Sequence, residues 1–313
     1  MYHRVAIPDF DPWWLSVTPV NFEEQMRVIK KYGRPVQMQE MGEKLKHFTI
    51  GKKEIVVTFD DAYADNFKNA KPILERHDIP ATFFVTTGAI DSNEEFWWDE
   101  IGGIILTAKI IPQMFEMSIA GTMYNWKIKQ EELPKPLRYN PGSYHNNIEL
   151  SRTQLYYALW EILLYLPFKE KKYILKQISS WASQSSTHRH DYLPMKSQEL
   201  QALAGSSLFE IGAHTINHPI LSHLPQEEQE YEITQSKHFL ENMLNLPITS
   251  FSYPHGDYSS ETLKIIEQLN FKNACTVVEN PVLNNANPHL LPRFMVLNWT
   301  KEQFEQRLRS WLK

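Results

Sequence analysis

Residues 54–59 read Glu-Ile-Val-Val-Thr-Phe, and Asp60-Asp61-Ala62-Tyr63 follow directly. A short run rich in β-branched and aromatic residues predicts a buried strand. Two adjacent carboxylates each disfavour ionisation of the other, so a pair at a strand end indicates a nearby cation. One carboxylate would bind a divalent metal, and the other would remain as a base. A solvated turn explains the pair equally well from the local sequence, because Asp is common in turns.

A second apolar run, residues 209–213, ends at His214, and His218 follows four residues later. Two histidines at this spacing can face one point, and neutral imidazole is a common zinc ligand. The alternative is two unrelated surface histidines in a chain that has 12 of them. In a parallel α/β fold, however, strand ends share one face. Asp61, His214 and His218 therefore form a candidate catalytic metal site with room for water or substrate.

A third apolar run, residues 249–253, leads into Pro254-His255-Gly256-Asp257. The proline and the glycine bracket a sharp turn, whose backbone N–H groups could face a developing oxyanion. From the local sequence alone, an ordinary turn is the better interpretation.

The order of these motifs resembles the polysaccharide deacetylases, metal-dependent carbohydrate esterases that remove N-acetyl groups from amino sugars. The motifs are Thr58-Phe59-Asp60-Asp61, His214-Thr215-x-x-His218-Pro219 and Phe251-x-Tyr253-Pro254-x-Gly256. The resemblance extends over nearly the whole chain except a central insertion, and the first two motifs in this order are specific. It implies an irregular (β/α)7 barrel.

The resemblance also implies a role for each matching residue. Asp60 matches the catalytic base, and the metal ligands are matched by Asp61, His214 and His218. The backbone N–H of His255 matches the oxyanion donor. Zn²⁺ is the expected ion, and Ni²⁺ or Co²⁺ would suit the same imidazoles.

Two positions depart from the family pattern. The arginine that orients the base is replaced by Ser252, and Arg293 at a later strand end is the expected substitute. The late leucine-x-histidine motif, which supplies the general acid, is not clear, because His289 precedes the leucines. Some relatives, including the biofilm poly-N-acetylglucosamine deacetylases, supply the acid from a tyrosine-histidine pair on the first strand. Tyr2 and His3 match that pair, so His3 is the expected acid, and a buried structural histidine is the alternative.

Strands alternate with helices along most of the chain, which predicts a parallel sheet in one catalytic domain over residues 1–313. The alternation stops at about 97–198. We expect a mostly helical insertion there, beside the barrel mouth and not a separate domain. Residues 96–98, Phe-Trp-Trp, open the insertion. Their rings could stack on a sugar or could anchor the insertion.

Composition narrows the range of partners. The chain has 313 residues, a formal net charge of −5 and no long basic run, which argues against nucleic acid and anionic membranes as partners. The single cysteine excludes an intramolecular disulfide. With no apolar run typical of a signal or a membrane span, we expect a cytoplasmic protein, unless residues upstream of Met1 are missing. The oligomeric state is open.

The expected activity is metal-dependent removal of an N-acetyl or similar N-acyl group from an amino sugar or glycan intermediate. Hydrolysis of another C–N bond, such as that of a cyclic imide, on the same barrel is one alternative. A catalytically silent carbohydrate-binding relative is another. The intact set of base and ligands argues against the silent relative, because binding alone needs neither.

Overall fold

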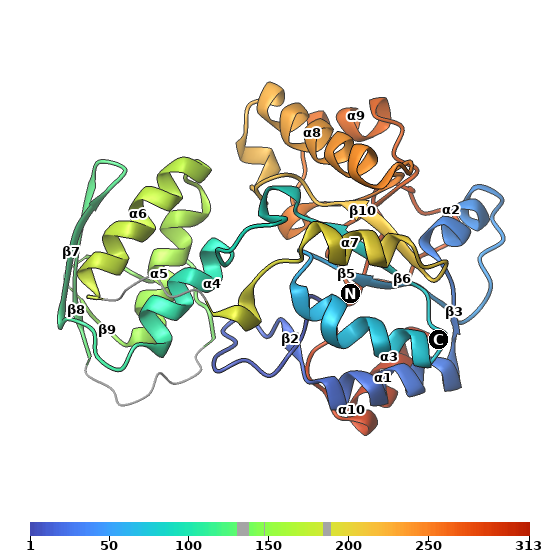
Figure 1. Ribbon diagram of the computed structural model, residues 1–313, viewed down its shortest axis with the longest axis horizontal. Coiled ribbons are helices and arrows are strands. Elements are labelled where there is room, and N and C mark those ends of the chain that lie inside the picture. The colour runs from blue at the N-terminus through green and yellow to red at the C-terminus, as the bar shows by residue number, and fades with distance from the viewer. Residues whose placement is uncertain (130–137, 147, 184–188) are drawn as a thin grey trace. The chain divides into compact units, whose positions relative to one another are not determined.

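The computed structural model describes residues 1–129, 138–146, 148–183 and 189–313 (Figure 1). These residues divide into two compact units. The first unit comprises Met1–Pro8, Trp14–Ser92 and Leu193–Lys313, and the second comprises Asp9–Trp13 and Asn93–Tyr192.

The first unit is built on a five-stranded parallel sheet with the strand order β12-β11-β10-β6-β5. The strands are β5 (Val57–Phe59), β6 (Ala81–Val85), β10 (Phe209–Ala213), β11 (Ser250–Ser252) and β12 (Asn273–Cys275). All their residues except Glu210 are buried, as expected for a parallel sheet that is covered on both faces. The apolar runs of the sequence analysis are therefore strands.

Two extended segments continue this sheet beyond its edge strands. Tyr2 forms a parallel bridge with Phe59 of β5, and Leu291 forms one with Cys275 of β12. The two segments also contact each other, because the Val296 N–H donates to the Met1 carbonyl at 3.0 Å. This curled parallel sheet agrees with the irregular (β/α)7 barrel that the sequence predicted.

Helices pack around the sheet of the first unit (Figure 1). They are α1 (Pro19–Tyr32), α2 (Met38–Lys46), α3 (Lys71–Arg76), α7 (Ser197–Ala204), α8 (Gln226–Leu244), α9 (Ser260–Gln268) and α10 (Lys301–Trp311), with a π-helix, η1 (Asn66–Ala70), before α3. Ser259 and Thr300 cap α9 and α10 through capping boxes. The cap of α1 is Thr18, because Pro19 occupies the first helical position, where a missing N–H costs nothing.

Short strands complete the first unit. They are β1 (Arg4–Val5), β2 (Ser16–Val17), β3 (Arg34–Pro35) and β4 (Glu54–Ile55). Stacked rings run through the core beneath the site. The ring centroids of Phe59 and Phe83 lie 4.9 Å apart, and those of Tyr2 and Phe59 lie 5.5 Å apart. This packing fixes the end of β5 and the residues that follow it.

The second unit corresponds to the expected insertion, and it adds a sheet to the helices that the sequence predicted. Its helices are α4 (Trp97–Gly102), α5 (Arg152–Leu164) and α6 (Phe168–Trp181). Its sheet, which the sequence analysis did not predict, has β7 (Met114–Ile119), β8 (Thr122–Ile128) and β9 (Glu149–Leu150). Ala120 and Gly121 join β7 to β8 with φ angles of 49° and 81°, the pair of positive values that a tight hairpin turn needs. Helices thus make up most of the regular structure in the described part of the insertion, and a small sheet accompanies them.

The aromatic residues that open the insertion belong to the core of the second unit. Phe96, Trp97 and Trp98 are all buried, and the rings of Phe96 and Trp98 stack with centroids 4.7 Å apart. Of the two roles considered for them, anchoring fits this burial and sugar stacking does not. Among the described residues, no helix combines the length and the apolar character that crossing a membrane requires.

Candidate metal centre and catalytic site

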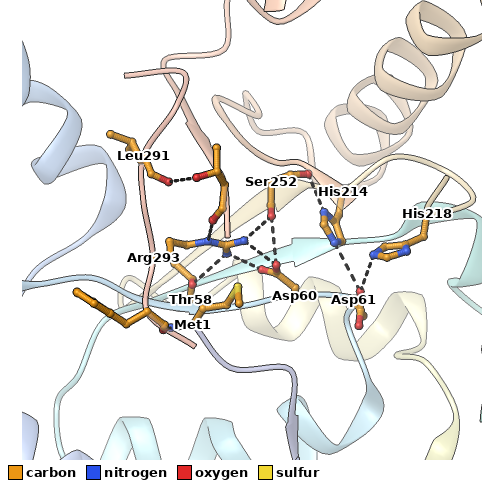
Figure 2. A network of polar contacts seen from close by, with 11 residues as sticks. Met1, Thr58, Asp60, Asp61, His214, His218, Ser252, Leu291 and Arg293 are labelled. Atoms are coloured by element: carbon orange, nitrogen blue, oxygen red, sulfur yellow. Dashed lines mark hydrogen bonds and ion pairs between the residues drawn. The ribbon is translucent and has the colours of Figure 1, made fainter. Parts of the chain in front are cut away.

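Three strands of the five-stranded sheet, β5, β10 and β11, bring the candidate residues together at their carboxyl ends, with β6 between β5 and β10 (Figure 2). Asp60 and Asp61 follow β5, His214 follows β10, and Ser252 ends β11. In a parallel sheet these ends lie at one edge, which explains how residues far apart in the sequence meet.

Asp61, His214 and His218 form one buried cluster in which a potential ligand atom from each lies within 4.8 Å of the others. The Nε2 atoms of His214 and His218 lie 3.6 and 3.4 Å from Asp61 Oδ1. Two ligand atoms on one tetrahedral zinc ion lie about 3.4 Å apart. Asp61 Oδ1 is buried and lacks a hydrogen-bond donor among the described residues. The cluster therefore fits a divalent metal ion that would compensate this carboxylate.

The imidazole of His214 is oriented by the backbone of β11. Its Nδ1 lies 2.7 Å from the Ser252 carbonyl oxygen, so Nδ1 carries the proton and donates it (Figure 2). The other ring nitrogen, Nε2, is then left with its lone pair facing Asp61. A hydrogen bond from the far side of a ligating histidine is a recurrent feature of metal sites.

The backbone around the cluster is strained. Asp61, Thr215, His218 and His255 have φ angles of 74°, 62°, 54° and 57°, in the left-handed region that residues other than glycine rarely adopt. Such conformations persist only where the surroundings determine them, and they concentrate at functional sites. These strained conformations therefore indicate that the loops serve a function rather than the stability of the fold.

A buried carboxylate from α8 holds the loop between the two histidines. Glu232 Oε2 accepts the backbone N–H groups of Ile216 and Asn217 at 2.8 and 2.9 Å, and its Oε1 accepts the Asn217 side-chain amide at 2.7 Å. From the other side, the Gly88 N–H donates to the Ile216 carbonyl at 2.9 Å. These contacts stabilise the strained loop in the shape that brings its histidines together.

Asp60 is paired with Arg293, as the sequence analysis expected. The guanidinium donates to both carboxylate oxygens, at 2.7 Å to Oδ1 and 2.8 Å to Oδ2 (Figure 2). The same group donates to the Ser252 hydroxyl at 2.8 Å, and that hydroxyl donates to Asp60 Oδ2 at 3.2 Å. Arg293 thus takes the place of the arginine that the family pattern has at position 252. Ser252, which occupies that position here, contacts both Arg293 and Asp60.

The environment keeps Asp60 ionised. Burial by itself raises the pKa of this carboxyl, but the Arg293 guanidinium outweighs burial and holds the pKa well below its usual range. Arg293 is fixed in turn, because its Nε donates to the Thr276 carbonyl at 2.9 Å and its Nη1 to the Thr58 hydroxyl at 3.2 Å. A carboxylate that is held in place and ionised at neutral pH is available to accept a proton during a reaction.

His3 lies beside the same strand end. The Tyr2 N–H donates to the Thr58 carbonyl at 2.8 Å, and the Asp60 N–H donates to the Tyr2 carbonyl at 3.1 Å. His3 therefore follows the residue that pairs with the end of β5. Burial lowers the pKa of its imidazole, and the charges of Asp61 and Asp60 partly offset this shift.

His255 is also next to the cluster. Its ring packs edge-on against the ring of His218, with centroids 4.5 Å apart. It lies in the short turn Pro254–Gly256, directly after β11. The role expected for its backbone N–H, as an oxyanion donor, stays a prediction.

The sequence analysis quoted Thr58 in a motif without giving it a role, and it missed Thr276 and Glu232. Thr58 is the middle residue of β5, whereas Thr276 directly follows β12, a position that was a usable signal. Glu232 lies on a helix among other glutamates, Glu227, Glu228 and Glu230. Nothing in its local sequence separates it from them, because its partners belong to a loop that is distant along the chain.

Comparison with known proteins places this arrangement in a family. Residues 49–119 and 170–274 match the family model described as polysaccharide deacetylase. A putative polysaccharide deacetylase of Bacillus subtilis (strain 168), YxkH, is 29% identical over 126 residues, which are 40% of this chain and 44% of that protein. The chain thus aligns with less than half the length of this relative.

Other relatives align over most of the chain. A poly-β-1,6-N-acetyl-D-glucosamine N-deacetylase of Staphylococcus aureus (strain N315) is 19% identical over 95% of this chain and 72% of its own length. IcaB from Ammonifex degensii shares the fold with a TM-score of 0.61, 17% identity and coverage of 99% and 94% of the two chains. The Streptococcus pyogenes deacetylase PplD, solved in complex with acetate, has a TM-score of 0.57 and 20% identity, and the match covers 98% of this chain and 96% of that chain.

Proposed function

The chain belongs to the polysaccharide deacetylase family, and on that premise we propose that it is a metal-dependent hydrolase that removes N-acetyl groups from the amino sugars of a glycan. One observation carries the proposal. Of the two adjacent aspartates, Asp60 is saturated by Arg293, whereas Asp61 directs a buried oxygen without a donor among the described residues toward two imidazoles. A base and a metal ligand are thus separated within one dipeptide.

Asp61, His214 and His218 would hold the ion. Their donor set of one carboxylate and two imidazoles suits Zn²⁺ first, and Ni²⁺ or Co²⁺ could be held by the same groups. When bound, the ion would polarise the acetyl carbonyl and lower the pKa of water.

The side chains around the cluster supply proton transfer. Asp60 accepts a proton from the water that attacks the acetyl carbon, and Arg293 keeps this carboxylate ionised beforehand. The His255 N–H donates to the carbonyl oxygen as it gains negative charge. His3 then protonates the sugar nitrogen as the C–N bond breaks, because an amine leaves poorly as an anion. The products are acetate and a free amino sugar.

A β-1,6-linked N-acetylglucosamine polymer is the substrate class we propose to test first. The support is the alignment over 95% of this chain with a staphylococcal enzyme whose name specifies that polymer.

Acetate release tests the proposal. The metal-depleted protein should be inactive on β-1,6-linked N-acetylglucosamine oligosaccharides, and adding Zn²⁺, Ni²⁺ or Co²⁺ back should restore acetate production. A cyclic imide, assayed in parallel for ring opening, tests the alternative C–N bond. Ring opening without acetate release would replace the proposed reaction. Sugar binding without turnover of either substrate, at full metal content, would favour a silent binding protein.

A further inference from the structure

His3 lies between an isolated bridge and a two-residue strand, so its segment makes only short pairings with the rest of the sheet. Tyr2 makes an isolated bridge to Phe59, and β1 itself spans only two residues, which pair with β2. Two-residue pairings contribute few hydrogen bonds, and independent stability of a sheet needs more strands than two. Backbone bonds hold the residues on either side of His3, since the Asp60 N–H donates to the Tyr2 carbonyl at 3.1 Å and the Arg4 N–H to the Leu15 carbonyl at 3.1 Å.

Side chains of Asp65 and Asn66 supply further backbone contacts. Asn66 Nδ2 donates to the His3 carbonyl at 2.8 Å, and the Val5 N–H donates to Asp65 Oδ1 at 2.8 Å. The two side chains also contact each other, because Asn66 Nδ2 donates to Asp65 Oδ1 at 2.9 Å. Both residues are buried, Asn66 completely. They occupy the positions that a neighbouring strand would otherwise fill.

An ion pair locks the same segment. Arg4, directly after His3, donates through Nε to Asp65 Oδ2 at 2.9 Å, and its guanidinium lies over the Tyr63 ring, 4.7 Å from the centroid. The exposed fractions of the Arg4 and Asp65 side chains are 3% and 7%. Buried ion pairs contribute little net stability, and their best-attested use is to fix one arrangement among several. Here that arrangement is the placement of the His3 segment.

We propose that Asn66, supported by Asp65, is a positioning residue that sets His3 for proton delivery to the leaving nitrogen. The proposal rests on the proposed function, in which His3 is the acid. Asp60 and Asp61 lie in the same stretch of chain as Asp65 and Asn66, a few residues earlier. One continuous segment therefore carries the base, a metal ligand and the two side chains that bind the backbone around the acid. Because these groups are close along the chain, the position of the acid is tied to that of the base.

A double-mutant cycle between His3 and Asn66 tests this. Asn66→Ala should lower kcat on an N-acetylated β-1,6-glucosamine oligosaccharide by about 10–100-fold with little change in KM, because small displacements of a catalytic group cost this much. An aryl acetate, whose phenolate leaves without a proton, should lose far less. In a His3→Ala background, Asn66→Ala should cause no further loss on the oligosaccharide, since it acts only through His3.

Asn69 offers a matched control. Its Nδ2 donates to the Val5 carbonyl at 2.7 Å, so Asn69→Ala removes the same kind of bond from the same strand, two residues beyond His3. Its kcat should stay within about twofold of the parent, because a bond at Val5 bears on His3 only indirectly. Metal content and thermal unfolding, measured for every variant, separate lost placement from lost structure.

Several outcomes would overturn the inference. Equal losses on both substrates, or an undiminished effect of Asn66→Ala in the His3→Ala background, would show that Asn66 acts through the fold. If Asn66→Ala does not fold, Asn66→Ser, which keeps a polar group there, replaces it, and unfolding of both variants would equally assign a structural role. A fully active His3→Ala enzyme would instead refute the acid assigned under the proposed function, which is a distinguishable result.

Discussion

The two aspartates at the end of β5 are neighbours in the sequence and differ completely in their surroundings. Asp60 is bonded through both oxygens to Arg293 and also accepts from Ser252, so its charge is compensated by the protein. Asp61 faces His214 and His218, and its Oδ1 has no donor among the described residues. Identical side chains thus acquire different chemistry from their environment, one closed by the protein and one open to a cation.

Removing a candidate metal ligand that faces Asp61 should have the largest effect on activity. His214→Ala removes one of the two imidazoles, so bound metal and turnover should be lost together. Bound metal should fall below about one tenth of an ion per chain, and acetate release should fall to the assay background. Metal analysis after dialysis, with acetate release on the same samples, checks this. His238→Ala, at an exposed position on α8, is the control and should retain both. Full metal content in His214→Ala would remove this residue from the ligand set.

A substitution of Asp60, the aspartate that is paired with Arg293, should lower turnover without removing the metal. Asp60→Asn keeps the size of the side chain but removes proton acceptance, so kcat should fall by about 10²–10⁴-fold while the metal remains bound. The exposed Asp78, whose side chain is 82% accessible, provides Asp78→Asn as a control. Loss of the metal in Asp60→Asn with retention in Asp61→Asn would exchange the two roles.

Removing the cation from the closed side should change the pH dependence. Arg293 lowers the pKa of Asp60, so the native carboxylate contributes stability above the unfolded value of about 3.9 and loses it only as the pH falls toward the lower folded value. In Arg293→Met the strongest interaction that opposes burial is gone, so the pKa of Asp60 should rise. The acidic limb of kcat/KM should then move upward by about 1–3 units.

The same substitution leaves a buried carboxylate unpaired, so the free energy of unfolding at neutral pH should fall by about 3–5 kcal/mol and should partly recover on acidification. Arg27→Met, which removes an arginine whose side chain is 52% exposed, should change neither quantity. An acidic limb that stays in place in Arg293→Met would show that Asp60 is not the titrating base.

The smallest effect is expected from Glu232, which binds the loop between the two histidines. Glu232→Gln keeps the shape but turns an acceptor into a donor opposite the Asn217 amide, so the loop between the histidines should loosen. Metal affinity, measured by titration against a chelator, should fall by about 10–100-fold. Glu228→Gln, at an exposed position of the same helix, should leave the affinity unchanged. Equal affinities for the two variants would show that the loop holds its shape without Glu232.

The strand-borne part of the site could be predicted from the sequence. The residues that follow β5, β10 and β11 are marked by apolar runs that stop at polar groups, and parallel strands bring such ends together. Even Arg293 was predicted, because Ser252 left a cation missing and another strand end offered one. In these cases the sheet ladder does the positioning, and the ladder has a sequence signal.

Parts that depend on single side-chain contacts could not be predicted. Glu232, Asp65 and Asn66 bind backbone groups of segments that are remote or not strand-like in pattern, and no periodicity reveals such partners. The hairpin of β7 and β8 was missed for a related reason. Its alternation is interrupted by exposed apolar residues such as Met114 and Met123, which are 45% and 61% exposed. Packing within the second unit, rather than pattern, defines it.

The position of the cluster in the chain makes a bound ion a reversible cross-link. Asp61 precedes and His214 follows the whole segment Asn93–Tyr192 of the second unit, so the ion would join two parts of the chain that are separated by this segment. An ion that binds only the folded state raises the stability of that state as the ion concentration rises. The metal that serves catalysis would then also stabilise the fold reversibly, in proportion to its supply.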